Sequence, residues 1–358
     1  MARAPMAWPA AAPVAVPAVL AVDGGNSKTD VALVSAEGDL LAAVHGPTSS
    51  HQAVGLEPGM ATLELLVDQA RRAAGLADRP PVAGLAGRAP VAGLGVYSLA
   101  GADYPSDVRL LLRALERRQL AANNLVLNDT FGALRAGTRR PWGVVLICGQ
   151  GVNGAGVAPD GRQVRFDALG TISGDWGGGR AVGAAGHGAA VRARDGRGGR
   201  TSLERLAPAH FGLRTPGQLT RALYDGKIAE RRLAELSPVV FGAAVAGDAV
   251  AREIIDRLAD ELVAMAGALI RRLRLRRLDP DVVLAGGVFH ADDPAFYVRL
   301  DAGVRDVAPA ARLVRLSEPP VLGAALIGLD RLSGQGAVDE AVEARLRAAF
   351  ATWRPGGA

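Results

Sequence analysis

The sequence has 358 residues, of which 49% are hydrophobic and 22% charged, which is typical of a globular chain with room for two domains. Its net charge of +5 comes from arginines that accompany no aromatic interleaving and no DNA-reading motif, which argues against nucleic-acid binding. The single cysteine, Cys148, excludes disulfides and multi-cysteine metal sites within one chain, and the five histidines have no metal-ligand spacing.

The first residues do not have the pattern of a membrane or secretion signal. No apolar run reaches the roughly 20 residues that span a bilayer, so we expect no membrane partner. Residues 1–17 are rich in alanine and proline, and Pro9, Pro13 and Pro17 interrupt the apolar core that a signal peptide needs. We therefore expect a disordered leader on a cytoplasmic protein.

The first patterned segment is an apolar run, a glycine-rich polar turn and a second apolar run. Residues 19–23 lead into Gly24-Gly25, and residues 31–34 follow the polar turn 26–29. Aliphatic residues on both sides of two glycines predict a strand, a tight turn and a strand. Because glycines let a ligand approach the backbone, a phosphate-binding turn is one interpretation, and an ordinary hairpin is the other. Asp23, at the end of the first strand, is suited to hold a hydrated metal ion.

From residue 40 to residue 135 the pattern alternates between strands and helices. We expect strands at residues 40–45, 91–99 and 124–127, and helices at residues 58–74, 107–118 and 131–135. Ser106 is the expected cap of the second helix. Loops are expected at residues 46–55, at Pro80-Pro81 and at residues 101–105.

Asp129 directly follows one of these strands. A carboxylate at this position is suited to accept the proton of an attacking hydroxyl or to hold Mg²⁺. The alternative is a helix cap, because Asp129 directly precedes an expected helix. Its place between two glycine-rich turns in the sequence favours the catalytic role.

The second glycine-rich turn repeats the plan of the first. A strand-like run at residues 142–148 leads into the glycine-rich residues 149–154, and Asp160-Gly161 predicts a hairpin into residues 162–166. The glycines fit G-x-G-x-x-G, but no helix follows them, so a phosphate-binding turn suits this context better than a dinucleotide site. The repeat implies two similar lobes, each offering a glycine turn to one ligand.

The rest of the chain is mainly helical. Helices are expected at residues 179–193, 202–211, 216–224, 237–246, 248–275, 294–304 and 321–332, with strands at residues 281–285 and 313–316 and one amphipathic helix in the tail. Asp175 is suited to bind substrate hydroxyls with Trp176 stacking nearby; alternatively, this segment is a connection with Trp176 in the core. Gly286-Gly287-Val288 lets an adenine lie against backbone, or forms an ordinary turn.

In this order, the segments resemble the acetate and sugar kinase/heat-shock cognate/actin superfamily over about residues 19–332. The closest likeness is to the N-acetylglucosamine kinase group, which shares a family with the activator ATPases of benzoyl-CoA reductase. The resemblance implies a bilobal actin-like, ribonuclease H-like α/β fold with a duplicated β-β-β-α-β-α plan. We expect the leader at residues 1–17, lobes at 18–130 and 131–332, the second with helical insertions, and a tail helix within 333–358.

The resemblance also assigns roles to residues. The implied ATP-phosphate-binding residues are Gly24, Gly25, Asn26, Ser27, Lys28, Thr29, Gly149, Gln150 and Gly151. The implied adenosine-binding residues are Gly286, Gly287 and Val288, and the implied sugar-binding residues are Ser50, His51, Gly101, Asn153, Asp175 and Trp176. Asp129 is implied as the catalytic base, with Mg²⁺ held by Asp23 and Asp129.

Three departures from the group's motifs fall in the sugar-facing loops. Ser50 stands where the group has a sugar-binding asparagine, and Leu169-Gly170 stands in place of a G-W-G motif. Trp176-Gly177-Gly178 replaces the sequence E-G-S. These changes bear on which sugar is bound and leave the nucleotide chemistry intact.

We therefore expect an ATP- and Mg²⁺-dependent kinase. It would transfer the γ-phosphoryl group to a hydroxyl, by resemblance the 6-hydroxyl, of N-acetylglucosamine or a related amino sugar. An alternative is an ATPase that activates a partner protein; those activators hold an iron–sulfur cluster with paired cysteines, and Cys148 has no partner in the sequence. A third alternative, a sugar-sensing regulator, needs a DNA-binding module that neither terminus supplies. A homodimer is expected from the resemblance alone.

Overall fold

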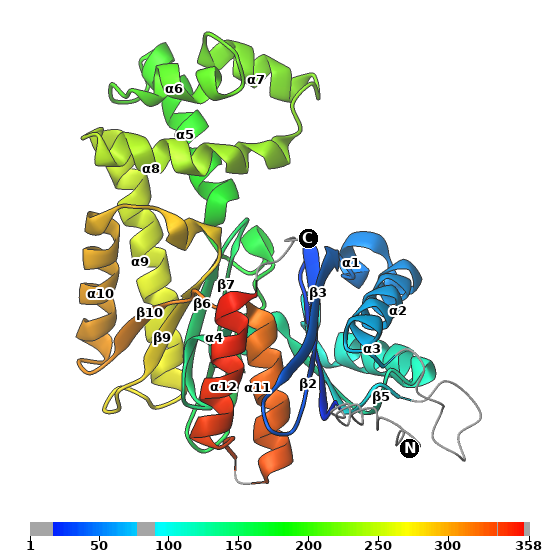
Figure 1. Ribbon diagram of the computed structural model, residues 1–358. Coiled ribbons are helices and arrows are strands. Elements are labelled where there is room, and N and C mark those ends of the chain that lie inside the picture. Colours follow the sequence, from blue (N-terminus) through cyan, green and yellow to red (C-terminus); the bar gives the residue numbers. More distant parts are fainter. Residues whose placement is uncertain (1–16, 77–89, 335, 354–358) are drawn as a thin grey trace, which may run out of the picture. The chain divides into compact units, whose positions relative to one another are not determined.

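The computed structural model describes residues 17–76, 90–334 and 336–353 (Figure 1). The predicted leader, except for Pro17, and the predicted loop at Pro80-Pro81 lie outside the described residues. The chain divides into two compact units. Unit 1 is Met1–Leu127 with Ala324–Ala358, and unit 2 is Asn128–Gly323. Each unit has its own five-stranded sheet.

The sheet of unit 1 has the strand order β3-β2-β1-β4-β5. Its strands are β1 (Val19–Gly24), β2 (Lys28–Val34), β3 (Leu40–Pro47), β4 (Ala92–Leu99) and β5 (Ala121–Asn128). β1 is antiparallel to β2 and parallel to β4, and β2 is antiparallel to β3. Because side chains alternate between the two faces of a sheet, one face carries Leu20, Val22 and Tyr97 into a buried core.

The helices of unit 1 cover both faces of this sheet. They are α1 (His51–Val54), α2 (Leu56–Ala73), α3 (Pro105–Arg118), α11 (Pro320–Ser333, of which the first residues belong to unit 2) and α12 (Glu340–Thr352). Leu63 of α2 and Leu111 of α3 are buried in the core that contains Leu20 and Val22. On the opposite face, Gly328 of α11 lies so close to Val19 that a Cβ on Gly328 would stand 2.6 Å from it.

The two units differ from the predicted domains in two ways. The boundary falls after Leu127 and not after Thr130. Residues 324–358 belong to unit 1, although the sequence pattern assigns them to the second lobe and a separate tail. The close packing of Gly328 on β1 explains this difference, because the helical periodicity of α11 predicts a buried face but not the sheet that it covers.

The sheet of unit 2 repeats the topology of the first, with the strand order β10-β9-β6-β7-β8. Its strands are β6 (Gly143–Cys148), β7 (Val152–Val157), β8 (Gln163–Arg165), β9 (Asp281–Ala285) and β10 (Arg312–Arg315). β6 is antiparallel to β7 and parallel to β9, as β1 is to β2 and β4. The predicted duplication of the β-β-β opening is therefore confirmed.

Most of the helical residues of unit 2 lie between β8 and β9. The α-helices of the unit are α4 (Asp129–Gly137), α5 (Gly178–Asp195), α6 (Leu203–His210), α7 (Pro216–Tyr224), α8 (Ser237–Val245), α9 (Ala249–Arg272) and α10 (Pro294–Val307). Short 3-10 helices are η1 (Gly170–Ile172), η2 (Glu230–Leu236) and η3 (Gly287–His290). α9 supplies much of the core through Leu258, Leu262 and Leu269, which are fully buried.

Most of the predicted elements are present, and the differences occur mainly at their ends. The prediction that Ser106 caps α3 is wrong, because the N-cap is Tyr104 and Pro105 is the first helical residue. Proline favours this position, since its fixed φ suits a helix and its missing N–H would be unpaired there. α1 and η2 are not predicted, and β5 begins three residues earlier than the predicted strand at residue 124.

Among residues 17–76, 90–334 and 336–353, no single helix is long and apolar enough to cross a membrane. The segments Glu230–Val245 and Ala249–Arg272 reach the required length and composition only as a pair, and they are bent by 115° relative to each other.

Candidate active site

The first glycine-rich turn connects β1 to β2. The Gly25 N–H donates to the Lys28 carbonyl at 2.9 Å, which closes the turn around Asn26 and Ser27. Asn26 and Ser27 are exposed, whereas Thr29 behind them is fully buried. The turn therefore presents an amide and a hydroxyl to solvent, and both groups can donate hydrogen bonds to phosphate oxygens.

A row of polar residues crosses four strands beside this turn. The register places Asp23 of β1 next to Asp30 of β2 on one side and Ser98 of β4 on the other. His45 of β3 pairs with Asp30. The buried carboxylate of Asp30 accepts from Lys28 Nζ at 2.9 Å and bonds His45 Nδ1 at 2.6 Å. Neighbouring carboxylates repel one another, so the Lys28 ammonium offsets the charge that Asp30 places beside Asp23.

The loop after β3 is bonded to the first turn through three successive hydroxyl residues. Their side chains reach back across 20 to 24 positions in the sequence to residues of the turn. The bonds are Thr48 Oγ1 to the Gly25 carbonyl (2.7 Å), Thr29 Oγ1 to Ser49 Oγ (2.9 Å) and Ser50 Oγ to Asn26 Oδ1 (2.7 Å). The structure thus brings together residues predicted for sugar binding and residues predicted for phosphate binding.

The loops after β3 and β4 meet beside α1. Gly101 lies against the side chains of His51 and Gln52. Gln52 Nε2 donates to Asp103 Oδ2 at 3.3 Å, and His51, Gln52 and Asp103 are all at least partly exposed. Three residues predicted to bind sugar, Ser50, His51 and Gly101, therefore cluster in unit 1, and exposed polar groups that can bind hydroxyls lie beside them.

The second glycine-rich turn connects β6 to β7 and is held by the first residues of α5. The Gly149 N–H donates to the Gly151 carbonyl at 2.9 Å. The Gly149 carbonyl accepts from Gly179 N–H at 2.7 Å, and the Gln150 carbonyl accepts from Arg180 N–H at 3.0 Å. These bonds tie the carbonyl groups, which would repel a phosphate, to α5. Gln150 and Gly151 are exposed at the tip of the turn.

Cys148 ends β6 immediately before this turn. Its thiol is completely buried, and burial raises the pKa of Cys148 to about 12. The thiolate, the form that reacts and binds metals, is therefore strongly disfavoured in the folded protein.

Asp129 is the first residue of α4. The N-cap of this helix is Asn128, whose Oδ1 accepts from Thr130 N–H at 3.2 Å and from Thr130 Oγ1 at 2.7 Å. The capping role that the sequence left open for Asp129 thus belongs to Asn128. Asp129 lies in the first turn of α4, where the partial positive charge of a helix N-terminus is favourable for an acidic residue.

The remaining residues predicted to bind sugar lie at the end of β7 that follows the turn and before α5. Asn153 Oδ1 accepts from Gly154 N–H at 2.7 Å, and the Asp175 carboxylate bonds the Ser173 hydroxyl. Trp176 packs against the core of unit 2, and the Arg257 guanidinium lies 4.0 Å from the centre of its indole ring. These contacts agree with the alternative in which Trp176 is part of the core, and its stacking on a sugar stays a prediction.

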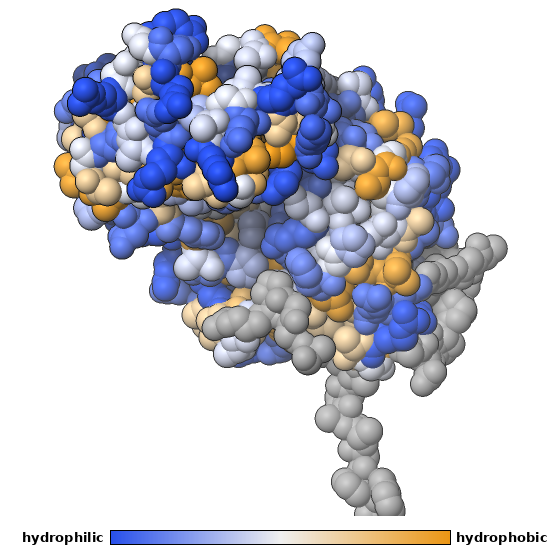
Figure 2. Space-filling model, turned by 90° about the horizontal axis from the view of Figure 1, so that it is seen from above, coloured by the Kyte–Doolittle hydropathy of each residue, from blue (hydrophilic) through white to orange (hydrophobic). Residues whose placement is uncertain are grey.

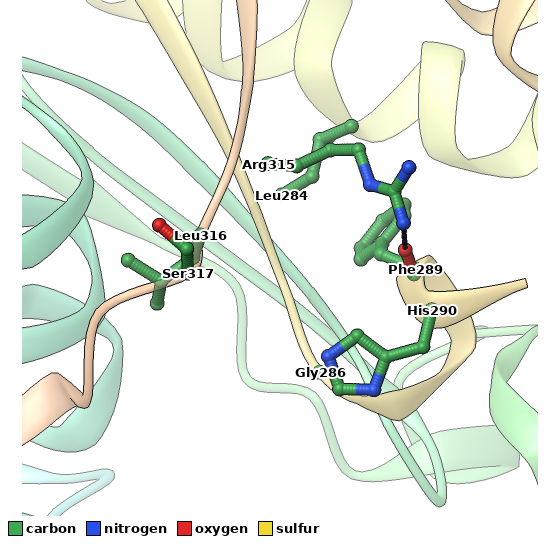
Figure 3. A pocket seen from close by; sticks show the side chains of 7 residues that line it. All are labelled: Leu284, Gly286, Phe289, His290, Arg315, Leu316 and Ser317. Atoms are coloured by element: carbon green, nitrogen blue, oxygen red, sulfur yellow. Dashed lines mark hydrogen bonds between the residues drawn. The ribbon is translucent and has the colours of Figure 1, made fainter. Parts of the chain in front are cut away.

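A pocket of about 290 Å³ opens beside the predicted adenosine-binding residues (Figure 3). It lies at the carboxyl ends of β9 and β10, between the segment 286–290 and the residues that follow β10. Its lining residues are Leu284, Gly286, Phe289, His290, Arg315, Leu316 and Ser317. Arg315 Nη2 donates to the Phe289 carbonyl at 2.7 Å, which fixes one wall. The size is at the lower end of small-molecule sites, roughly 300 Å³.

The described residues contain no group of three or more histidine, cysteine, aspartate or glutamate side chains that could hold a metal ion. Mg²⁺ does not require such a cage, because one or two carboxylates with phosphate and water oxygens usually complete its shell. The single carboxylate of Asp23, at the end of β1 and next to the first turn, fits this chemistry.

Several of the polar residues that hold the first turn are not among the predicted site residues. Asp30, His45, Thr48 and Ser49 lie outside the glycine-rich motif, and their bonds join strands and loops that are separated in the sequence. One available signal is the alternation of Lys28 and Asp30, which places two charged side chains on one face of β2.

Figure 2 shows one face of the molecule, on which hydrophobic residues lie singly or in small groups among hydrophilic residues. Large exposed hydrophobic side chains come from separate elements and include Ile172, Tyr224 and Val298. Scattered residues of this kind are ordinary on a protein surface. The expected homodimer stays a prediction.

Known proteins resemble this chain over most of its length. Residues 20–328 match the sequence profile of the BadF/BadG/BcrA/BcrD ATPase family. An N-acetyl-D-glucosamine kinase from Dictyostelium discoideum is 26% identical over 316 residues, which cover 87% of this chain and 97% of that protein. An N-acetylmuramic acid/N-acetylglucosamine kinase from Clostridium acetobutylicum is 27% identical over 273 residues, which cover 76% of this chain and 85% of that protein.

The fold is similar to that of a solved structure from Chromobacterium violaceum, a protein provisionally named an N-acetylglucosamine kinase. The TM-score is 0.67 at 22% sequence identity, and the match covers 87% of this chain and 99% of that one. The predicted fold class and the predicted family are both confirmed.

Proposed function

The chain belongs to the BadF/BadG/BcrA/BcrD ATPase family, and we propose that it is a kinase that transfers the γ-phosphoryl group of ATP to a hydroxyl of an amino sugar. N-acetylglucosamine or a close relative is the proposed acceptor, since two relatives matched over most of this chain are kinases of that class. The observation that carries the proposal is that each unit holds a glycine turn by backbone bonds at the end of its first strand.

The two turns are the proposed phosphate-binding elements. In the first turn, Asn26 and Ser27 offer side-chain donors. In the second turn, the carbonyl groups of Gly149 and Gln150 accept hydrogen bonds from α5 and therefore do not face a phosphate. Donors held in place before the reaction stabilise developing charge without reorganising. The adenosine would occupy the pocket beside Gly286, whose apolar and polar lining suits a purine and its ribose.

Asp129 is the proposed general base. The acceptor hydroxyl oxygen would bond to the γ-phosphorus of ATP while the bond to the ADP oxygen breaks, and the hydroxyl proton would pass to the Asp129 carboxylate. By resemblance the reacting group is the 6-hydroxyl. Asp23 is the proposed Mg²⁺ ligand of unit 1, and Mg²⁺ would supply charge neutralisation for the phosphate oxygens.

Each unit carries polar groups that are proposed as sugar contacts. His51 and Gln52 in unit 1, and Asn153 and Asp175 in unit 2, carry donors and acceptors for hydroxyl and acetamido groups. Ser50 and Trp176 are proposed to act indirectly, since Ser50 is only 3% exposed and Trp176 packs against the core of unit 2.

A partner-activating ATPase is the alternative within the same family. The activators that the sequence resembles hold a metal cluster between subunits with paired cysteines. In this chain the single cysteine is buried at the end of β6, and its raised pKa opposes the thiolate that a cluster needs. The observation favours the kinase over the activator.

The test is ADP release from the purified chain with Mg²⁺ and ATP, against N-acetylglucosamine, glucosamine, N-acetylmannosamine, N-acetylmuramic acid and glucose. We expect release that depends on one or two of these sugars. Asp129→Asn should reduce the rate by at least about 100-fold, the contribution of a general base. Asp160→Asn, in an exposed hairpin turn, is the matched control and should leave the rate unchanged. No sugar-dependent release with any acceptor would overturn the proposal.

A further inference from the structure

Ser50 occupies the N-cap position of α1 but does not cap it with its side chain. A serine at this position normally accepts from an N–H of the first turn of the helix. Here the side chain makes no capping bond, and the hydroxyl donates to Asn26 Oδ1 at 2.7 Å instead. A serine at an N-cap position whose hydroxyl does not cap the helix indicates a role for that hydroxyl outside the helix.

The backbone of Ser50 is bonded on both sides, and its side chain is buried. Its N–H donates to Thr48 Oγ1 at 3.1 Å, and its carbonyl accepts from Ala53 and Val54 at 3.0 Å each. The side chain is only 3% exposed, and water therefore cannot easily replace Asn26 as its partner.

The bond to Ser50 orients the amide of Asn26. Because the amide is planar, an oxygen held by the Ser50 hydroxyl leaves the two N–H donors of Asn26 Nδ2 on the opposite side. Asn26 is exposed at the tip of the first glycine turn, where these donors can meet a ligand.

We propose that Ser50 is a positioning residue for ATP: it holds the Asn26 amide so that both N–H donors are presented to a phosphate oxygen of the nucleotide. The inference rests on the proposed function only in taking ATP as the ligand of the first turn. It also changes the predicted role of Ser50, which acts on the nucleotide through Asn26 and is not a direct contact of the sugar.

Ser50 directly precedes His51, a proposed sugar contact, so the same loop touches both substrates. The hydroxyls of Thr48, Ser49 and Ser50 join this loop to the phosphate turn at three points. The loop therefore links His51 to the phosphate turn through hydroxyl bonds that do not depend on a bound sugar.

The test is a double-mutant cycle on Asn26→Ala and Ser50→Ala, measured as the Kd for the non-hydrolysable ATP analogue AMPPNP with Mg²⁺ and without sugar. Each single variant should weaken binding by about tenfold, a typical value for one hydrogen bond to a charged group. The double variant should be no weaker than Asn26→Ala alone, because Ser50 has nothing left to orient. A full further loss in the double variant would overturn the proposal.

Ser49→Ala is the matched control, because it also removes one hydroxyl bond to the turn, the one from Thr29 Oγ1, but leaves the printed bonds of Ser50 and Asn26 in place. Its effect should multiply with that of Asn26→Ala. Asn26→Asp covers the case in which Ser50→Ala does not fold. It keeps an oxygen for Ser50 but replaces the N–H donors by charge, so it should weaken binding more than Asn26→Ala. Unchanged binding in Asn26→Asp would contradict the proposal.

The readouts separate this inference from the proposed function. Binding of AMPPNP is measured without an acceptor, so the Ser50 result holds even if no sugar is phosphorylated. The converse result is ADP release that depends on sugar, while the effects of Asn26→Ala and Ser50→Ala on the Kd for AMPPNP are independent. That result would support the proposed kinase activity and reject the positioning role of Ser50.

Discussion

Gly178 at the start of α5 lies against Gly151 in the second glycine turn, so closely that a Cβ on Gly178 would stand 2.5 Å from the Gly151 Cα. Gly178 also has a φ of +73°, a conformation that residues with side chains rarely adopt. The two glycines therefore let α5 approach the turn closely enough for its N–H groups to bond the carbonyl groups of Gly149 and Gln150.

Gly178→Ala should damage the second turn. The added Cβ forces the start of α5 away from the turn, so we expect the kcat/KM for ATP to fall at least about tenfold, as for a displaced group in a positioned site. Gly188→Ala in the same helix is the control, because a Cβ there meets no atom within 4 Å and φ is not positive. It should keep full activity and gain up to about 1 kcal/mol of stability. Equal activity of the two variants would contradict this account of the turn.

Asp30→Asn should destabilise unit 1. The change keeps the shape of the side chain but removes the buried charge that Lys28 and His45 share. We expect the free energy of unfolding to fall by about 1–3 kcal/mol, measured by urea denaturation. Asp160→Asn removes a carboxylate from an exposed pair with Arg162 and should cause no measurable change. A loss of stability in Asp160→Asn as large as in Asp30→Asn would show that burial is not the cause.

Tyr97→Phe should not cost stability. The Tyr97 hydroxyl is buried among the described residues without a hydrogen-bond partner, and burial raises its pKa. Removing an unpaired buried hydroxyl is neutral or stabilising by up to about 1 kcal/mol. Tyr297→Phe is the contrast, because the Tyr297 hydroxyl donates to the Phe289 carbonyl at 2.6 Å, and its loss should cost about 1 kcal/mol. Thermal unfolding of both variants checks the difference in sign.

His187 should make unit 2 less stable in acid. Burial lowers the pKa of His187 below its usual 6.5, and its Nδ1 has no partner among the described residues. The unfolded chain therefore binds more protons than the folded one below about pH 6.5, and stability falls as the pH falls through that range. His187→Gln should flatten this decline while retaining a hydrogen-bonding partner for Thr220. If the free energy of unfolding fell equally with pH in the wild type and in His187→Gln, this role of His187 would be contradicted.

The strands and turns of the site are predictable from the sequence because the signals are local. Two glycines between aliphatic runs define each turn, and hydrophobic periodicity locates the helices to within a few residues. The bonds that hold the turns are not local. Asp30 meets His45 only through the register of two strands, and Ser50 meets Asn26 across 24 positions.

Other differences arise where one residue type serves several roles. A serine before a helix predicts a cap, but at α3 Pro105 shifts the start of the helix, and at α1 the Ser50 hydroxyl is directed elsewhere. Asp129 and Asn128 are both good caps, and only the structure assigns that role to Asn128. The periodicity of α11 predicts a buried face, and the contact of Gly328 with Val19 identifies the sheet.

The measurement that tests the central proposal most directly is the amount of phosphorylated sugar formed for each ADP released, with γ-labelled ATP and the best acceptor. A kinase with Asp129 as base should give a ratio close to one, and Asp129→Asn should lose both products together. ADP release without labelled sugar, at a rate that the acceptor does not change, would contradict the kinase and identify the chain as an ATPase of the partner-activating kind.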